Sequence, residues 1–182
     1  ALAEEMGRIC RRDFDPPEVT NCRTVTMLHF GERPLYRAVF GLASRPAPPE
    51  TVSGDACRQF CDSAGRAQML LCDGMGTGKP AAVDGQMAAK LTAQLLRAGF
   101  AAESAARLVN VALGLKGAEQ EAGATLDLLT VDLYTGRAGL FKAGAAPSFL
   151  CRAGVVRTLD GASLPMGVLP TVTGRSTALT LD

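Results

Sequence analysis

The chain has 182 residues, of which 47% are apolar and 20% charged, and its formal net charge is +1. A near-neutral chain with Trp 0 and Tyr 2 offers neither a basic surface nor the aromatic side chains that stack on bases, so no nucleic-acid partner is expected. The length suits one domain with a sizeable hydrophobic core, and no apolar run approaches the roughly 20 residues that cross a bilayer.

The first elements expected are a helix and a hairpin. Residues 1–12 have the apolar spacing of a short amphipathic helix, which Pro16 ends. Residues 23–30 and 36–42 alternate between apolar and polar side chains on either side of a Gly-Glu-Arg-Pro turn, which predicts a β-hairpin.

A second hairpin is predicted from residues 52–57 and 66–72. They flank Asp-Ser-Ala-Gly at 62–65, which has the composition of a four-residue hairpin loop. This loop would pair Cys61 with Arg66 and so fix the register of the two strands.

The predicted register brings two carboxylates to one end of this hairpin. Asp55 would lie opposite Cys72, one position from Asp73, at a range where directly opposed Cβ atoms are about 5 Å apart. A shift of the register by one residue is left open. Carboxylates this close repel unless a cation lies between them, and oxygen ligands suit a hard divalent cation.

Asp73 leads directly into the stretch Gly74-Met75-Gly76-Thr77-Gly78-Lys79-Pro80. Alternate glycines tolerate positive φ and let backbone groups approach an ion or a phosphate closely. The stretch is not a nucleotide-binding P-loop, because three residues instead of four precede Gly-Lys and Pro80 replaces the hydroxyl residue. The spacing of a dinucleotide-binding loop is absent too. A plain turn remains an alternative.

Two consecutive helices are predicted next, over residues 80–99 and 101–115. Their expected buried stripes are Val83, Met87, Leu91 and Leu95 in the first, and Ala105, Leu108, Val109, Ala112 and Leu113 in the second. Strands are then expected over residues 124–133, 138–143, 148–152, 155–159 and 172–181. Strands, two helices and strands again predict an α+β fold of mainly antiparallel sheets flanked by a helix pair.

The six cysteines are expected to be reduced and mostly buried. Cys57 and Cys61 form the only close pair, and a zinc site would need two further ligands nearby. The single histidine, His29, is expected to be a structural strand residue. A zinc or redox site built on the cysteines stays open as an alternative.

Five ordered motifs resemble those of the metal-dependent type-2C (PPM) serine/threonine phosphatases, and most closely the phosphatase module of the bacterial stage II sporulation protein E family. They are Val52-Ser53-Gly54-Asp55, Asp73-Gly74-Met75-Gly76-Thr77-Gly78, Ala124-Thr125-Leu126-Asp127-Leu128, Lys142-Ala143-Gly144-Ala145-Ala146-Pro147-Ser148-Phe149 and Leu164-Pro165-Met166-Gly167-Val168-Leu169.

The resemblance implies a PPM-type β-sandwich flanked by helices, with two manganese or magnesium ions at one end. In such a site Asp73 would be the bridging ligand, Gly74 a ligand through its carbonyl oxygen, and Asp55 a ligand or an acceptor for metal-bound water. Asp127 also matches a motif position, but it lies in an apolar strand and is expected to be a satisfied buried carboxylate. The implied substrate is a phosphoserine or phosphothreonine protein, such as the anti-anti-sigma factor of the family's sigma factor regulation in sporulation.

The resemblance also divides the chain into 1–22, a linker or the end of a preceding regulatory segment, and 23–182, the phosphatase domain. Further metal-binding aspartates of the family lie in a second Asp-Gly motif and near the C-terminus. The pairs Asp84-Gly85 and Asp160-Gly161 are interpreted as a helix surface and a turn, and the sequence is expected to stop before both family positions. The domain is therefore expected to be C-terminally incomplete and weakly active or inactive. We expect a cytoplasmic domain whose parent is anchored in the membrane, and a homodimer is left open. The alternative function is a non-catalytic interaction or regulatory module that keeps the fold.

Overall fold

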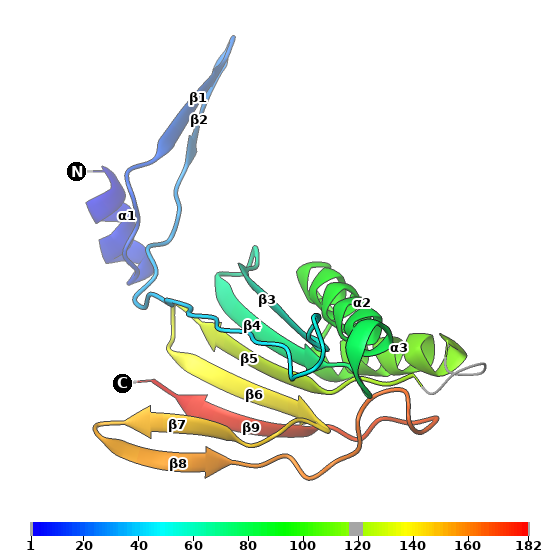
Figure 1. Cartoon of the computed structure of the whole chain (residues 1–182). Coiled ribbons are helices and arrows are strands. Elements are labelled where there is room, and N and C mark those ends of the chain that lie inside the picture. The colour runs from blue at the N-terminus through cyan, green and yellow to red at the C-terminus, as the bar shows by residue number, and fades with distance from the viewer. Residues whose placement is uncertain (1, 117–121, 182) are drawn as a thin grey trace.

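The computed structural model describes residues 2–116 and 122–181, which contain three α-helices and nine β-strands (Figure 1). The helices are α1 (Leu2–Cys10), α2 (Gly78–Arg97) and α3 (Ala102–Lys116). The strands are β1 (Glu18–Cys22), β2 (Val25–His29), β3 (Asp55–Cys61), β4 (Arg66–Asp73), β5 (Leu126–Asp132), β6 (Arg137–Ala143), β7 (Ser148–Arg152), β8 (Val155–Leu159) and β9 (Arg175–Thr180).

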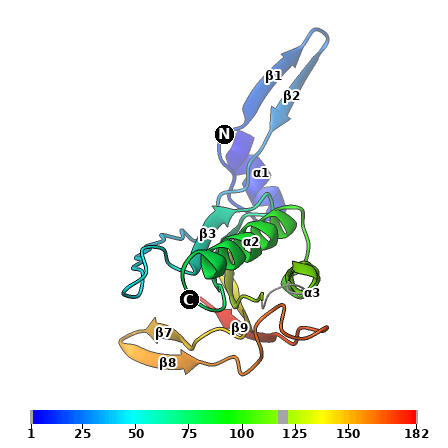
Figure 2. The ribbon, with the colours of Figure 1, turned by 45° about the vertical axis from the view of Figure 1, so that its right-hand side comes forward.

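One five-stranded sheet forms the body of the molecule, with strand order β3-β4-β5-β6-β9 and antiparallel pairing throughout. Helices α2 and α3 cover one face, and the β7–β8 hairpin lies on the side away from them (Figure 2). Helix α1 and the β1–β2 hairpin project from the body (Figure 1). The predicted α+β class, with antiparallel sheets flanked by a helix pair, is confirmed. No helix in the described ranges is long and apolar enough to cross a membrane.

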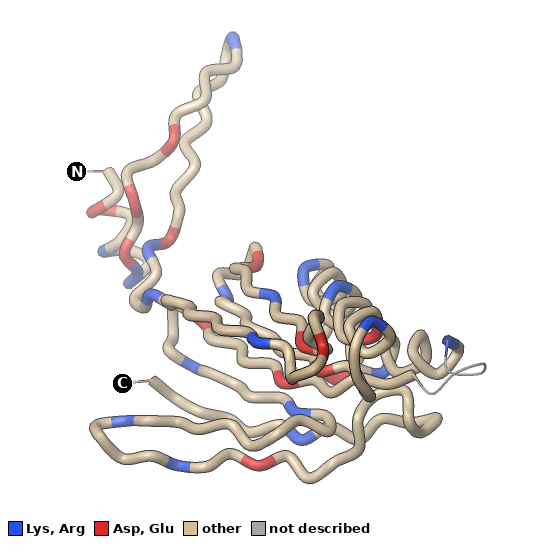
Figure 3. Tube along the Cα trace, viewed as in Figure 1, with Lys and Arg blue, Asp and Glu red and all other residues tan. Residues whose placement is uncertain are grey.

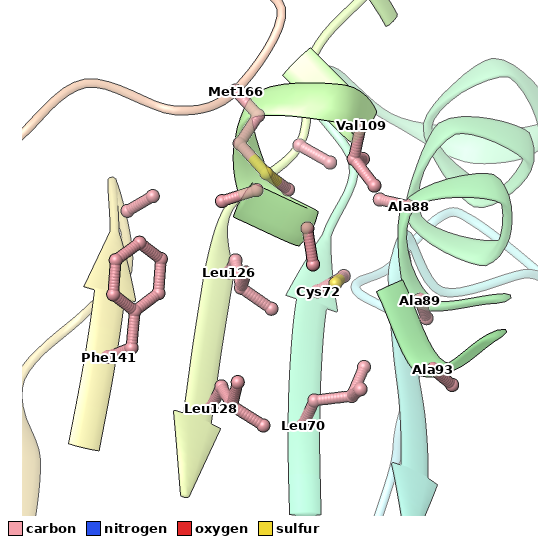
Figure 4. Close-up of a cluster of buried hydrophobic side chains, with 14 of the residues drawn as sticks. Leu70, Cys72, Ala88, Ala89, Ala93, Val109, Leu126, Leu128, Phe141 and Met166 are labelled. Carbon is pink, nitrogen blue, oxygen red and sulfur yellow. The ribbon is translucent and has the colours of Figure 1, made fainter. Parts of the chain in front are cut away.

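The hydrophobic core lies between the sheet and the two helices. Strand side chains that alternate toward the helices meet mostly small residues of α2 and apolar residues of α3, among them Val109 (Figure 4). The labelled members of this layer are Leu70, Cys72, Leu126, Leu128, Phe141, Met166, Ala88, Ala89, Ala93 and Val109. Each fully buried leucine contributes roughly 2 kcal/mol of transfer free energy, so this layer holds α2 and α3 on the sheet.

The buried face of α2 differs from the predicted stripe. Val83 is 54% exposed, and the other three residues predicted for that stripe are only partly buried. The buried positions are instead mostly small: Gly78, Ala81, Asp84, Gly85, Ala88, Ala89, Thr92, Ala93 and Leu96. Small side chains let the helix approach β3 and β4 closely. These small residues recur with the 3.6-residue period of a helix, and this period in the sequence indicated the buried face. In α3 the prediction holds for Ala105, Val109 and Leu113, whereas Leu108 is 48% exposed.

The predicted N-terminal hairpin was also wrong. Strand β2 pairs with β1, which precedes it, through a tight turn in which Arg23 has φ 37°. Residues 36–42 form no strand, because the backbone N–H of Tyr36 donates to the carbonyl of Leu133 and the tyrosine ring packs on Gly136. This segment therefore binds the turn between β5 and β6 instead of β2.

Candidate metal centre

Asp55 and Asp73 lie directly opposite each other at the end of the β3–β4 hairpin. The predicted partner of Asp55 was Cys72, so the register differs by one residue. The difference arises in the turn, where the backbone N–H of Arg66 donates to Oδ1 of Asp62 at 3.0 Å and so lengthens the loop. The two carboxylates are therefore closer in register than the sequence predicted, at the directly opposed position of about 5 Å between Cβ atoms.

The environment of these carboxylates favours a cation. Burial, and then the negative charge of Asp55, raise the pKa of Asp73 above its ordinary value. Asp and Glu positions gather at this end of the sheet, beside α2 (Figure 3). Asp55 receives one local hydrogen bond, from Ser53 Oγ to its Oδ2 at 3.0 Å. A divalent cation between the two side chains would remove the repulsion.

The space beside Gly54 shows that a backbone oxygen lies next to the carboxylate of Asp73. A Cβ atom placed on Gly54 would lie 3.2 Å from Oδ1 of Asp73 and 3.2 Å from the carbonyl oxygen of Gly74. The two oxygens therefore flank one small space that only glycine leaves free. Carboxylate and carbonyl oxygens are the ligands of hard divalent cations. The predicted donors Asp55, Asp73 and Gly74 thus come together at one point of the fold, and the donor set fits such an ion.

The candidate metal donors at this end of the sheet are two side chains and one backbone group. Within residues 2–116 and 122–181, no three His, Cys, Asp or Glu side chains converge on a common point. The third predicted donor, the carbonyl of Gly74, supplements the carboxylates of Asp55 and Asp73.

Helix α2 and Thr125, which directly precedes β5, hold the glycine loop in place. The backbone N–H of Gly74 donates to the carbonyl of Gly54 at 3.1 Å. Asp73 exchanges two hydrogen bonds with Thr125, one to its Oγ1 and one from its N–H, each of 2.9 Å. A Cβ on Gly74 would overlap the carbonyl of Ala81 in α2, and a Cβ on Gly85 would overlap the carbonyl of Gly54. The loop and the helix are therefore in backbone contact.

Asp84 corrects one interpretation of the sequence. It was expected on the helix surface, but it is 3% exposed and forms an ion pair with Lys116 of α3. The pair joins the two helices, because Asp84 faces its neighbouring helix and not the solvent.

A cavity of ≈ 920 Å³ lies over the carboxylates. Asp55, Asp73 and Asp127 all line it, and Arg58 is the only cationic side chain of its described lining. The guanidinium of Arg58 donates to Gln86 Oε1 and to the carbonyl of Cys57, each at 2.7 Å. The cavity is large enough for a phosphoryl group together with part of the molecule that carries it.

Asp127 is only half satisfied. Its Oδ2 accepts hydrogen bonds from Lys142 Nζ and from Ser148 Oγ, both at 2.6 Å. Its Oδ1 is buried with no partner among the described residues. Sequence reasoning missed Lys142 and Ser148 as the hydrogen-bond partners of Asp127. The available signal was that both lie in one motif, and that antiparallel pairing of two consecutive strands puts Lys142 opposite Asp127.

The cysteines form no site of this kind. All six are free thiols, but only Cys72 is fully buried, so the expectation that most are buried was wrong. Strand alternation turns Cys61 to the exposed face, and Cys10, Cys22 and Cys151 lie on exposed elements. Burial raises the pKa of Cys72 to about 12. His29 lies on β2, where it is exposed.

Comparison with known proteins gives these features a context. Residues 63–182 match the family model described as Stage II sporulation protein E. Stage II sporulation protein E of Priestia megaterium is 31% identical over 140 residues, which are 77% of this chain and 24% of that protein. The protein of the same name from Bacillus subtilis (strain 168) is 30% identical over 140 residues, 77% of this chain and 17% of that protein. The chain thus spans about a quarter or less of these curated relatives.

Solved structures show the same fold. The PP2C phosphatase domain of SpoIIE from Bacillus subtilis, with a fragment of its regulatory domain, superimposes with a TM-score of 0.75 and 25% identity, over 98% of this chain and 55% of that one. RsbX in complex with magnesium gives a TM-score of 0.63 at 17% identity, over 76% of this chain and 65% of that chain. The second match supports the fold alone. The chain therefore has the PP2C phosphatase fold and belongs to the stage II sporulation protein E family.

Proposed function

We propose that this chain is part of a metal-dependent protein serine/threonine phosphatase. The observation that carries the proposal is the placement of Asp55 opposite Asp73, with the carbonyl oxygen of Gly74 beside them. A non-catalytic module with the same fold would need neither carboxylate there. The PP2C fold and the family membership support the same conclusion.

Asp55, Asp73 and the carbonyl of Gly74 would hold two divalent ions, manganese or magnesium. Such ions, when bound, lower the pKa of water toward neutrality and neutralise charge on a phosphoryl group. The chain's own residues orient the donors: Thr125 fixes the backbone of Asp73, and α2 supports Gly74. The cavity lined by both aspartates receives the phosphoryl group.

The substrate of this proposal is a phosphoserine or phosphothreonine protein, of the kind that the resemblance implies, an anti-anti-sigma factor. The cavity of ≈ 920 Å³ exceeds the volume of a phosphoryl group and can admit a polypeptide segment. The division into residues 1–22 and 23–182, a cytoplasmic placement, a membrane-anchored parent and a homodimer remain predictions.

The test is manganese-dependent hydrolysis of phosphorylated casein by the full gene product and by its Asp73→Asn and Asp55→Asn variants. Both substitutions remove a negatively charged donor, so we expect activity and manganese affinity to fall on the order of 100-fold or more. Asp132→Asn, at the opposite end of the same sheet, is the matched control and should keep both. No rate above the metal-free blank in the unmodified protein would refute the proposal.

A further inference from the structure

We propose that Lys142, Asp127 and Ser148 form a lock that fixes residues 144–148 as one wall of the carboxylate cavity, and that this wall binds the polypeptide beside the substrate's phosphoryl group. This inference rests on the proposed function and assigns its protein-binding surface. Ser148 is the first residue of β7, while Asp127 and Lys142 belong to the central sheet. The lock therefore ties the loop to the sheet.

The three side chains form a closed triangle of hydrogen bonds. Lys142 Nζ donates to Asp127 Oδ2 at 2.6 Å and to Ser148 Oγ at 2.7 Å. The hydroxyl of Ser148 donates in turn to Asp127 Oδ2 at 2.6 Å. Charged partners make such bonds roughly twice as strong as neutral ones. Ser148 is thus held by both members of an ion pair.

Burial makes this triangle hard to open. The side chain of Lys142 is 3% exposed, and that of Asp127 is 18% exposed. A Cβ on Gly161 would lie 2.6 Å from Cβ of Lys142, so the backbone at Gly161 covers the lysine stem. An ammonium group in this position needs its carboxylate partner, because an unpaired buried charge is strongly destabilising.

The other end of the loop is fixed as well. Gly144 has φ +64°, a left-handed conformation that favours glycine, and its N–H donates to Ser163 Oγ at 3.0 Å. A Cβ on Gly144 would overlap the backbone of Pro165. The segment between Gly144 and Ser148 is therefore anchored at both ends.

The anchored segment faces the space above the metal donors. Ala145, Ala146 and Pro147 line the cavity together with Asp55 and Asp73. None of the three carries a charge or a hydrogen-bonding side chain, so their side chains offer the phosphoryl group no polar contact. A small, apolar wall beside a charged floor suits the backbone and side chains that flank a phosphoserine.

The test compares two substrates in the Lys142→Met variant of the full gene product. p-Nitrophenyl phosphate is too small to need the wall, whereas phosphorylated casein presents a polypeptide to it. We expect KM for phosphorylated casein to rise on the order of fivefold, because a loosened loop must be ordered on binding. KM for p-nitrophenyl phosphate and the manganese affinity from calorimetry should change less than about twofold. Hydrogen exchange of the amides at 144–148 should accelerate.

Two further variants separate the lock from general stability. Lys116→Met breaks the Lys116–Asp84 pair between the helices and is the matched control, with an unchanged ratio of the two KM values. Ser148→Ala should reproduce part of the effect and Ser148→Thr should restore it, which keeps the test available if Lys142→Met does not fold. A lowered melting temperature with an unchanged KM ratio would overturn the proposal, and so would a parallel rise of both KM values.

Binding gives a readout that does not depend on turnover. The anisotropy of a fluorescent phosphoserine peptide from casein should show weaker binding to Lys142→Met than to the unmodified protein. Absence of turnover in the unmodified protein contradicts the proposed phosphatase function. Equal peptide affinity of the two proteins would contradict the proposal that the wall formed by residues 144–148 binds the polypeptide.

Discussion

Asp62 shows how one buried side chain sets the register on which the site depends. Its Oδ1 accepts the backbone N–H groups of Ala64 and Arg66, and its Oδ2 accepts Arg66 Nε at 2.8 Å and Gln68 Nε2 at 2.7 Å. Burial raises the pKa of Asp62, but the hydrogen bonds from Arg66 and Gln68 and the charge of Arg66 outweigh burial and hold the pKa below its ordinary value. The carboxylate is therefore needed in its ionised form.

Asp62→Asn should lower the free energy of unfolding by about 2–3 kcal/mol, because the amide turns a donor toward groups that are themselves donors. Urea denaturation measures this change. Asp15→Asn is the control: its side chain is 56% exposed in a surface pair with Arg33, and such pairs contribute about 0–1 kcal/mol. Equal losses in the two variants would contradict the role given to Asp62.

The same carboxylate predicts a pH dependence. Its folded pKa lies below the unfolded value of about 3.9, so its stabilisation is complete above that pH and is lost as the pH falls through the folded pKa. The difference in unfolding free energy between the unmodified protein and Asp62→Asn should therefore shrink below about pH 4. Acid titration of both proteins, followed by circular dichroism, checks this. A difference that stays constant down to pH 2 would be inconsistent with it.

At the scale of elements, the close packing of α2 on the sheet depends on the missing side chain of Gly85. The helix lies against the ends of β3 and β4, where a Cβ on Gly85 would overlap the carbonyl of Gly54. Gly54 directly precedes Asp55, so a shift of the Gly54 backbone would also move this candidate metal donor. The close contact explains why α2 packs through small residues.

Gly85→Ala should cost about 2–3 kcal/mol of stability and weaken manganese binding, because overpacking shifts the backbone of Gly54. Thermal unfolding and calorimetric titration measure the two effects. Gly114→Ala is the matched control in α3, since a Cβ there meets nothing within 4 Å. It should stabilise the protein by about 0.5–1 kcal/mol, the helix preference of alanine over glycine. Equal changes in stability and manganese affinity in the two variants would contradict the close backbone contact at Gly85.

The sequence could predict most elements but not all of their contacts. Strands β7 and β8 have the predicted bounds, and α2 and α3 begin and end within two residues of the prediction. Large aliphatic side chains indicated only the border of the buried face of α2: Met87, Leu91 and Leu95 are partly buried against the core and Val83 is exposed. The centre of that face is formed by alanines and glycines, which have the same helical period but a weaker hydrophobic signal. The register of β3 and β4 was off by one residue, because the side chain of Asp62 adds a contact that loop length does not reveal.

At the scale of the molecule, Cys72 reports on the core. It lies 1% exposed between the sheet and α2, and burial raises its pKa to about 12. The thiols of Cys10, Cys22, Cys61 and Cys151 are exposed. Reactivity follows the thiolate, so the core thiol is protected by access and by protonation together.

Reaction with a thiol reagent at pH 8 should therefore label the four exposed cysteines rapidly and Cys72 only at the rate of unfolding. Mass spectrometry of digested, time-resolved samples assigns each site. Cys72→Ser serves as the control, and it should remove the phase assigned to Cys72 while the labelling of the other five cysteines, the half-buried Cys57 included, stays unchanged. Fast labelling of Cys72 in the folded protein would contradict the packing described for the core.

The part of the candidate site that lies within one hairpin could be predicted from the sequence, whereas the part that depends on contacts between distant segments could not. Asp55, Asp73 and Gly74 follow from one hairpin and its glycine loop, whose chemistry is legible in the sequence. Lys142 and Ser148 were missed, because their role follows only when the pairing of β5 with β6 is combined with the return of the chain to Asp127 at Ser148.

The candidate metal donors all lie within or next to a single hairpin, which has a consequence for how the protein tolerates substitutions elsewhere. Asp55, Gly74 and the first turns of α2 are neighbours along the chain as well as in space, whereas β9 lies at the opposite edge of the sheet. The relative placement of Asp55, Asp73 and Gly74 is set by this hairpin and the start of α2, so contacts along that remote edge can change without displacing the three groups.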